Sequence, residues 1–228
     1  MKKIISILLV LLMCVSAFSL GDGKEKNSQL FIGYLANINN FDYKNYKDYL
    51  SASSVATTLA PTVGLSEFSV KNGSRAGFLT SFAVTFPYLS NLNLQDLKSN
   101  LPEEESAKDT LERIKSQNFY GLGLDAFLGP GFMLINTDFI KLPIALGLHL
   151  NGDINCFEKD VALSTTLRGG LGLTTGVELY LGGLNLFFHV QAAYDFYGLD
   201  YNITEKEFTH GRVSSVAILP KLGNGLKL

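Results

Sequence analysis

Hydrophobic and polar residues alternate with period two along most of this chain. Between Leu184 and Tyr197 every second residue from Leu184 to Phe196 is hydrophobic, and most of the intervening residues are polar. The same alternation runs through 163–181 and 140–151. Because successive side chains of a strand point to opposite faces of a sheet, this period predicts three long strands. One apolar face and one mostly polar face are typical of a strand between two unlike media.

Weaker alternation adds five more strands to these three. They are predicted at 28–42, 53–70, 74–90, 119–135 and 213–228. Each of the eight is long enough for the about 9 to 11 residues that a tilted membrane-spanning strand requires. The chain therefore has the strand number of a small β-barrel.

The connections between these strands alternate between short and long. Turns at 72–73, 136–138 and 182–183 contain the Gly, Asn or Asp residues that tolerate positive φ. The other connections are longer and polar, at 43–52, 91–116, 153–162 and 202–211. An up-and-down barrel has this alternation when one rim faces a confined compartment and the other faces the outside.

The composition of the polar face indicates which solvent surrounds the barrel. That face holds Gly, Ser, Thr and Ala with single charges, which suits a narrow, crowded interior. The other face is dense in Leu, Ile and Phe, which suits lipid. We therefore predict an all-β fold, an eight-stranded antiparallel up-and-down transmembrane β-barrel. The alternative is a secreted soluble barrel of the lipocalin type, which would carry an apolar ligand and be apolar inside.

The longest connection, 91–116, carries a separate signal. Asn100 precedes Pro102 and the acidic run Glu103 to Glu105, an arrangement typical of a helix start. We expect a short helix from about Pro102 to Ile114 in this extracellular loop. Its acidic face is expected to be a solvated surface.

The first residues read as a targeting segment. Lys2 and Lys3 precede an apolar run, and Ala17 and Ser19 then fit a small-x-small cleavage site. We expect a signal peptide at 1–19 and a barrel domain at 20–228. Cys14 would leave with this segment. The alternative is a lipidated Cys14, although Met13 stands where a lipoprotein signal normally has Gly, Ala or Ser.

Charge and motifs argue against nucleic-acid binding, catalysis and metal binding. Lys and Arg number 19 against 21 Asp and Glu, so the chain lacks the basic surplus of a nucleic-acid binder. His189 and Asp195 share a strand six residues apart, about 20 Å at the rise of a strand and too far for a dyad. We expect no catalytic site, no cofactor and no metal, since neither GxSxG nor HExxH occurs and the three histidines show no ligand spacing.

The candidate functional residues are the charged and titratable side chains on the predicted inner faces. They are Arg75, Asp125, Lys141, His149, Arg168, Glu178, His189, Asp195 and Lys221. Isolated charges in a confined interior are costly, so these groups should form ion pairs. They would either plug the barrel with a salt-bridge network or line a polar conduit, and Arg168 with Glu178 or Asp125 is the first expected pair.

The C-terminus matches the pattern polar-x-Gly-x-x-hydrophobic-x-hydrophobic through Lys221, Gly223, Leu226 and Leu228. This pattern resembles the terminal insertion signal of outer-membrane barrels, although Leu stands where aromatic residues are usual. With the eight strands, the chain resembles the small OmpW/OprG-like and OmpA/OmpX-like outer-membrane barrels.

The resemblance implies a cell outer-membrane location, contact with outer-membrane lipid, insertion by the barrel-assembly machinery and a monomeric state. It implies either a porin-like transport role for small or hydrophobic solutes, or a cell-surface role in which the loops bind host or surface ligands.

Overall fold

The structure is a computed structural model, and it is described here for most of the chain. The described residues are 24–46, 50–71, 73–99, 119–157, 163–182, 184–202, 207–209 and 211–226. The expected signal peptide at 1–19 and the helix expected at Pro102–Ile114 lie outside them. Among the described residues, no helix is long and apolar enough to cross a membrane.

Strands account for nearly all of the described residues. They are β1 (Lys24–Tyr46), β2 (Leu50–Lys71), β3 (Ala76–Thr85), β4 (Tyr88–Ser99), β5 (Phe119–Asn136), β6 (Ile140–Phe157), β7 (Leu163–Leu181), β8 (Leu184–Asn202), β9 (Glu207–Thr209) and β10 (Gly211–Leu226). The short β9 pairs only with the end of β8.

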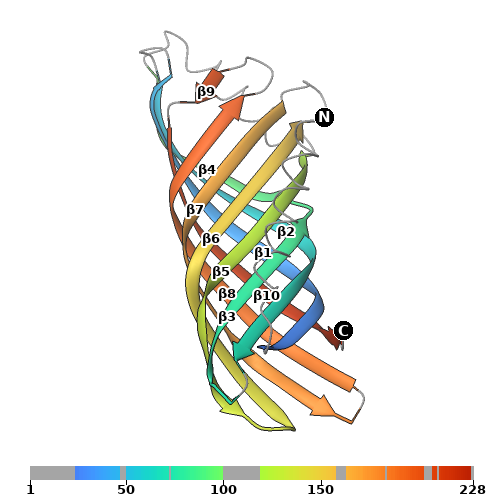
Figure 1. Cartoon of the computed structure of the whole chain (residues 1–228). Coiled ribbons are helices and arrows are strands. Elements are labelled where there is room, and N and C mark those ends of the chain that lie inside the picture. Colours follow the sequence, from blue (N-terminus) through green and yellow to red (C-terminus); the bar gives the residue numbers. More distant parts are fainter. Residues whose placement is uncertain are drawn as a thin grey trace.

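The sheet closes on itself to form a barrel (Figure 1). The first long strand, β1, pairs antiparallel with both β2 and β10, so the described sheet has no free edge along this seam. The strands β3 and β4 are interrupted only at Phe86 and Pro87, and both pair with β2. Across the interruption the Phe86 amide donates to the Pro61 carbonyl and the Pro87 carbonyl accepts from the Gly121 amide, each at 3.0 Å, so the wall is continuous there. Counting β3 and β4 as one wall strand and setting aside the short β9, which lies off the closed path, gives eight wall strands. The predicted eight-stranded antiparallel barrel is therefore confirmed.

The three short turns lie together at the lower end of the barrel in Figure 1. Gly73 has φ +77° and Gly182 has φ +67°, the left-handed conformation expected of these turn residues. In the β5–β6 turn, the Thr137 hydroxyl accepts a hydrogen bond from the Ile140 amide at 3.0 Å. The predicted short connections are therefore confirmed.

The strands are longer at the opposite end than the hydrophobic pattern indicated. The strand β6 continues to Phe157, through residues that the pattern assigned to a loop, and β1 and β2 continue to within three residues of each other. A ladder needs only backbone N–H and C=O groups, so pairing continues through polar sequence where the alternation ends. The strand β4 likewise continues to Ser99. The loop boundaries predicted at 43–52, 91–116 and 153–162 were therefore wrong.

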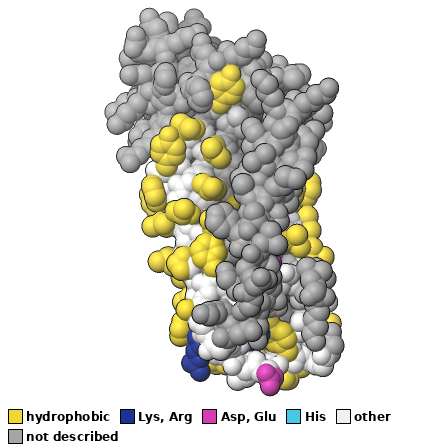
Figure 2. All heavy atoms as spheres, viewed as in Figure 1, with side chains coloured by type: hydrophobic (Ala, Val, Ile, Leu, Met, Phe, Trp, Pro, Cys, Tyr) yellow, Lys and Arg dark blue, Asp and Glu magenta, His cyan; other side chains and the backbone are white. Residues whose placement is uncertain are grey.

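The two faces of the wall are distributed as predicted. On β6, Leu146, Leu148 and Leu150 are 61%, 58% and 52% exposed, whereas His149 and Asn151 between and beside them are buried. Figure 2 shows hydrophobic side chains covering much of the described outer wall in that view. A soluble ligand-carrying barrel would need the opposite arrangement, so the structure does not support the lipocalin alternative.

A bulge in β8 changes one predicted orientation. Gly169 pairs with Tyr197 and Gly170 pairs with Asp195, so Phe196 has no residue opposite it. Phe196 and Tyr197 both point outward in consequence, and Tyr197 is 61% exposed. The inward position expected for Tyr197 was wrong.

An apolar cluster fills part of the interior. It consists of Phe68, Val70, Leu79, Phe127, Met133 and Ala145, all buried. The Phe68 ring packs where glycine leaves room: a Cβ on Gly77 or Gly131 would lie 2.6 Å or 2.7 Å from a ring carbon. The cluster packs β2, β3, β5 and β6 against one another inside the barrel.

Candidate functional site

Eight charged or titratable side chains are buried in the described part of the barrel, each at most 5% exposed. They are Asp125, His149, Asp153, Arg168, Glu178, His189, Asp195 and Lys221. They stand on β5, β6, β7, β8 and β10, at positions that alternate with the exposed apolar residues. The alternation places them inside the barrel, where they form three groups of contacts.

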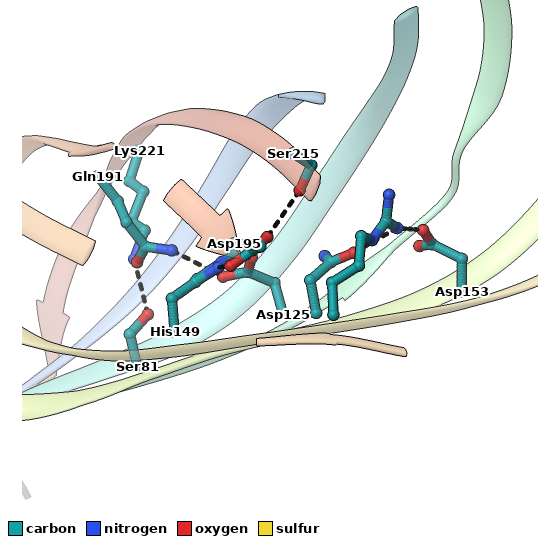
Figure 3. A network of polar contacts seen from close by, with 10 residues as sticks. Ser81, Asp125, His149, Asp153, Gln191, Asp195, Ser215 and Lys221 are labelled. Carbon is teal, nitrogen blue, oxygen red and sulfur yellow. Dashed lines mark hydrogen bonds and ion pairs between the residues drawn. The ribbon is translucent and has the colours of Figure 1, made fainter. Parts of the chain in front are cut away.

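The central layer is built on His149. Its Nδ1 lies 2.7 Å from Asp195 Oδ1, and its Nε2 lies 2.7 Å from Asp125 Oδ2. The Ser215 hydroxyl donates to the other oxygen of Asp195 at 2.8 Å. Figure 3 shows the imidazole ring between the two carboxylates.

Glycine on the intervening strand permits this arrangement. His149 on β6 and Asp195 on β8 are both paired with Gly170 on β7, so their contact passes over that residue. A Cβ on Gly170 would lie 2.5 Å from the Asp195 Cα. The absence of a side chain at this position therefore lets β6 and β8 make contact over β7.

Hydrogen bonds extend the central layer across the interior. Gln191 on β8 donates to Asp125 on β5 at 2.9 Å, and its side-chain oxygen accepts from Lys221 at 2.7 Å. Lys221 on β10 also donates to Ser81 on β3 at 2.7 Å, and its ammonium lies 4.9 Å from the centre of the Phe31 ring. Two strands, β1 and β2, separate β10 from β3 around the wall. These contacts therefore bridge the lumen rather than follow one wall.

A second layer lies nearer the loop end and is built on Arg168. Its guanidinium forms an ion pair with Asp153 and donates to Asn39 and, at 2.6 Å, to Asn151. The expected pairing of Arg168 with Glu178 or Asp125 was wrong, because both acids lie in other layers. The sequence prediction missed Asp153 by ending the strand at Asn151. Asp153 stands two residues beyond Asn151, on the same face as His149, and this spacing could have identified it.

The third layer lies nearer the short turns and is built on Glu178. One oxygen, Oε1, lies 3.2 Å from His189 Nε2. The other oxygen, Oε2, accepts from Asn27 at 2.5 Å and from the Tyr180 hydroxyl at 2.8 Å. Among the described residues His189 Nδ1 has no hydrogen-bond partner, and the ring lies 4.8 Å from that of Phe187.

Two of the predicted interior residues do not join these layers. Arg75 lies in the turn before β3 and is exposed, because the alternation starts only at Ala76. Lys141 is half-buried at the turn end of β6, with its ammonium 4.7 Å from the centre of the Tyr180 ring. Arg75 was therefore placed wrongly by the sequence, and Lys141 lies at the rim.

The C-terminal residues have a structural role where they are described. Gly223 on β10 leaves room for the Phe187 ring, since a Cβ would lie 2.6 Å from a ring carbon. Leu226 is the last residue of β10 and is paired with Ser28, and Leu228 lies outside the described residues. The role of Gly223, Leu226 and Leu228 as an insertion signal stays a prediction.

The geometry of the central layer is not that of a nucleophilic site. Both ring nitrogens of His149 face carboxylates, so the ring has no free lone pair with which to accept a proton from a serine. Ser215 donates to Asp195 rather than to the imidazole. In the described part of the chain, no group of three or more His, Cys, Asp or Glu side chains is arranged to hold a metal ion.

Comparisons with known proteins find likeness in fold only. No protein-family model and no curated protein matches the sequence. Among solved structures, the outer membrane protein OprG from Pseudomonas aeruginosa is 10% identical, with 89% of this chain and 97% of that chain covered and a TM-score of 0.49. Ail, the attachment invasion locus protein of Yersinia pestis, in complex with the heparin analogue sucrose octasulfate, is 15% identical, with 89% and 99% covered and a TM-score of 0.41. The outer membrane protease OmpT from Escherichia coli is 6% identical, with 89% and 96% covered and a TM-score of 0.44.

The structure itself determines the class of protein. A closed barrel satisfies its backbone groups without water, and its leucine-rich outer wall is the surface that lipid requires. A polar interior and an apolar exterior together are typical of barrels in the bacterial outer membrane. The chain is an outer-membrane β-barrel protein.

Proposed function

We propose that this protein is a non-enzymatic surface barrel with a closed lumen, and that its function resides in the loops opposite the short turns. The observation that carries the proposal is the central network, in which Asp125, His149, Gln191, Asp195, Ser81, Ser215 and Lys221 connect five of the eight wall strands. A network of this extent occupies the space that a solute would need.

The other layers support the same reading. Arg168 on β7 reaches Asn39 on β1, and Asn27 on β1 reaches Glu178 on β7, with β8 and β10 between these strands around the wall. The buried Phe68 and Phe127 occupy another part of the interior. A conduit would require breaking buried charged contacts, each of which costs about 3–5 kcal/mol when one partner is lost.

In this proposal the charged residues buried inside the barrel fill the lumen and close it to solutes. Since the wall faces lipid and the interior is filled, the parts left for recognition are the connections at the loop end, above all the connection between β4 and β5, residues 100–118. We further propose that the protein is a monomer inserted by the barrel-assembly machinery, with the short turns in the periplasm.

Solute flux tests the closed lumen. Vesicles that contain the purified barrel should swell in isosmotic sugar or amino-acid solutions no faster than empty vesicles. A triple variant, Asp125→Ala, His149→Ala and Asp195→Ala, should admit small solutes because it empties the central layer. The control Leu148→Ala removes an outward side chain and should stay impermeable. Rapid swelling with the unaltered protein would contradict the proposal.

Loop deletion tests the surface role. Replacing the connection between β4 and β5, residues 100–118, by a short Gly-Ser linker should leave the heat-dependent gel shift of a folded barrel intact, because the wall strands and the interior layers lie elsewhere. Cells that display this variant should attach less to a mammalian cell layer than cells that display the unaltered barrel. Equal attachment by both would remove the support for recognition by this loop.

A further inference from the structure

The buried carboxylates of the described interior outnumber its ordinarily cationic groups. The described interior holds four carboxylates, on Asp125, Asp153, Glu178 and Asp195. It holds two groups that are ordinarily cationic, Arg168 and Lys221, and two histidines. The two imidazoles are the other buried groups of the described interior that can become cations.

The geometry of His149 identifies it as one of these cations. An ionised carboxylate only accepts hydrogen bonds, and the ring faces one from each nitrogen at 2.7 Å. A neutral ring carries one N–H, so its other nitrogen would direct a lone pair at a carboxylate oxygen. Two N–H donors, and hence an imidazolium, satisfy both contacts. The ring is fully buried, so bulk water does not supply the missing donor.

Neither Lys221 nor Arg168 forms a direct ion pair with Asp125 or Asp195 in the described structure. Lys221 on β10 contacts Asp125 only through the Gln191 amide, and Arg168 on β7 is engaged with Asp153 on β6. His189 pairs with Gly176 and His149 pairs with Gly170, so the two rings are six residues apart along β7, about 20 Å. The Ser81 and Ser215 hydroxyls from β3 and β10 are uncharged.

We propose that His149 is a pH-sensitive lock on the closed lumen. When the His149 ring is charged, it donates a hydrogen bond to Asp125 on β5 and another to Asp195 on β8. When alkaline solution removes its second proton, two buried carboxylates lose their shared cation and the central layer must admit water and small cations. The lock is therefore present at neutral pH, where the ring is charged and the carboxylates are ionised, and is lost as the pH rises. This inference rests on the closed lumen proposed above.

The charge of the ring can be measured directly. Side-chain ¹⁵N NMR of the histidine-labelled barrel in detergent, with His189→Gln and His210→Gln variants to assign the signals, should show an imidazolium at His149 at pH 7. That signal should change to a neutral ring in alkaline solution. A neutral His149 at pH 7 would overturn the lock whatever the vesicle experiments show.

Ion flux then tests the consequence. Potassium flux into vesicles should be at the background level at pH 7 and rise at least tenfold once the ring is neutral. Asp125→Asn should abolish this rise, because an amide at position 125 can donate to the lone pair of a neutral ring. Lys221→Gln should retain the rise in potassium flux. Lys221 is the other buried group of the central layer that loses a proton in alkaline solution, so this variant distinguishes its effect from that of His149.

The outcomes separate this inference from the proposed function. Flux already present at pH 7 would contradict the closed lumen. Flux absent at every pH, or a rise that Lys221→Gln abolishes, would overturn the lock and leave the closed lumen standing.

Discussion

The barrel contains two histidine-carboxylate layers, and they differ in how completely the ring is satisfied. In the central layer both nitrogens of His149 contact carboxylates. In the layer near the short turns His189 Nε2 lies 3.2 Å from one carboxylate oxygen, and neither ring nitrogen has a hydrogen-bond partner among the described residues. Both rings are at most 1% exposed. Equal burial thus accompanies unequal pairing.

The two histidines differ in pairing because different side chains surround their rings. Gly170 lets His149 reach over β7 to Asp195, while Asp125 approaches from β5 on the other side. His189 has Glu178 on one side and the Phe187 ring on the other. A histidine that contacts a carboxylate from each ring nitrogen should contribute more to the stability of the fold than a histidine that contacts a carboxylate from one nitrogen.

The largest expected effect is that of His149→Leu. The substitution leaves two buried carboxylates without their shared cation, which should lower the free energy of unfolding by about 3–5 kcal/mol. Urea unfolding in lipid vesicles, read from the gel mobility of the folded and unfolded forms, measures this loss. A change below about 1 kcal/mol would show that the central layer does not depend on the ring.

A smaller loss is expected for His189→Leu. Only one contact with a carboxylate disappears, and two ring nitrogens without a hydrogen-bond partner in the described structure are removed with it, so the cost should be about 1–3 kcal/mol. The same unfolding assay gives the value. A loss equal to or greater than that of His149→Leu would reverse the ranking of the two layers.

Glu178→Gln should cost less still. The amide oxygen can still accept from Asn27 and Tyr180, so the change in unfolding free energy should stay within about 1 kcal/mol. Asp195→Asn provides the matched change in the central layer and should cost more. Equal costs would mean that pairing on both nitrogens confers no advantage.

The smallest effect is the coupling between the layers. The rings are about 20 Å apart along β7 and share no contact in the described structure, so the costs of His149→Leu and His189→Leu should add within about 0.5 kcal/mol. A double-mutant cycle measures the coupling. A larger interaction energy would show that the layers act as one unit.

Much of the fold could be predicted from the period of the sequence. Alternation on strands such as 140–151 determines which side chains face lipid, because one face must be apolar along its whole length. The Gly residues at 73 and 182 identified turns because they adopt positive φ. The sequence did not indicate the bulge at Phe196 or the extension of β6 past Asn151, since both depend on backbone pairing rather than on side-chain polarity.

The candidate site could be predicted only in part. The alternation selected His149, Asp125 and Asp195 as inner residues, but not their mutual contacts, which depend on the strand register. Arg168 shows this limit, because its partner Asp153 stands on the neighbouring strand, β6, at a position that the pattern had left in a loop. Arg75 shows the opposite error: the pattern placed it inside a strand, whereas it lies in the turn before β3.

Single-channel recording of the unaltered barrel in a planar lipid bilayer at pH 7 tests the closed lumen most directly. The three layers predict a flat baseline in 1 M KCl over many insertions, with insertion verified by recovery of the heat-shifting barrel from the membrane. Reproducible, stepwise ion currents that scale with the number of inserted barrels would contradict the closed lumen.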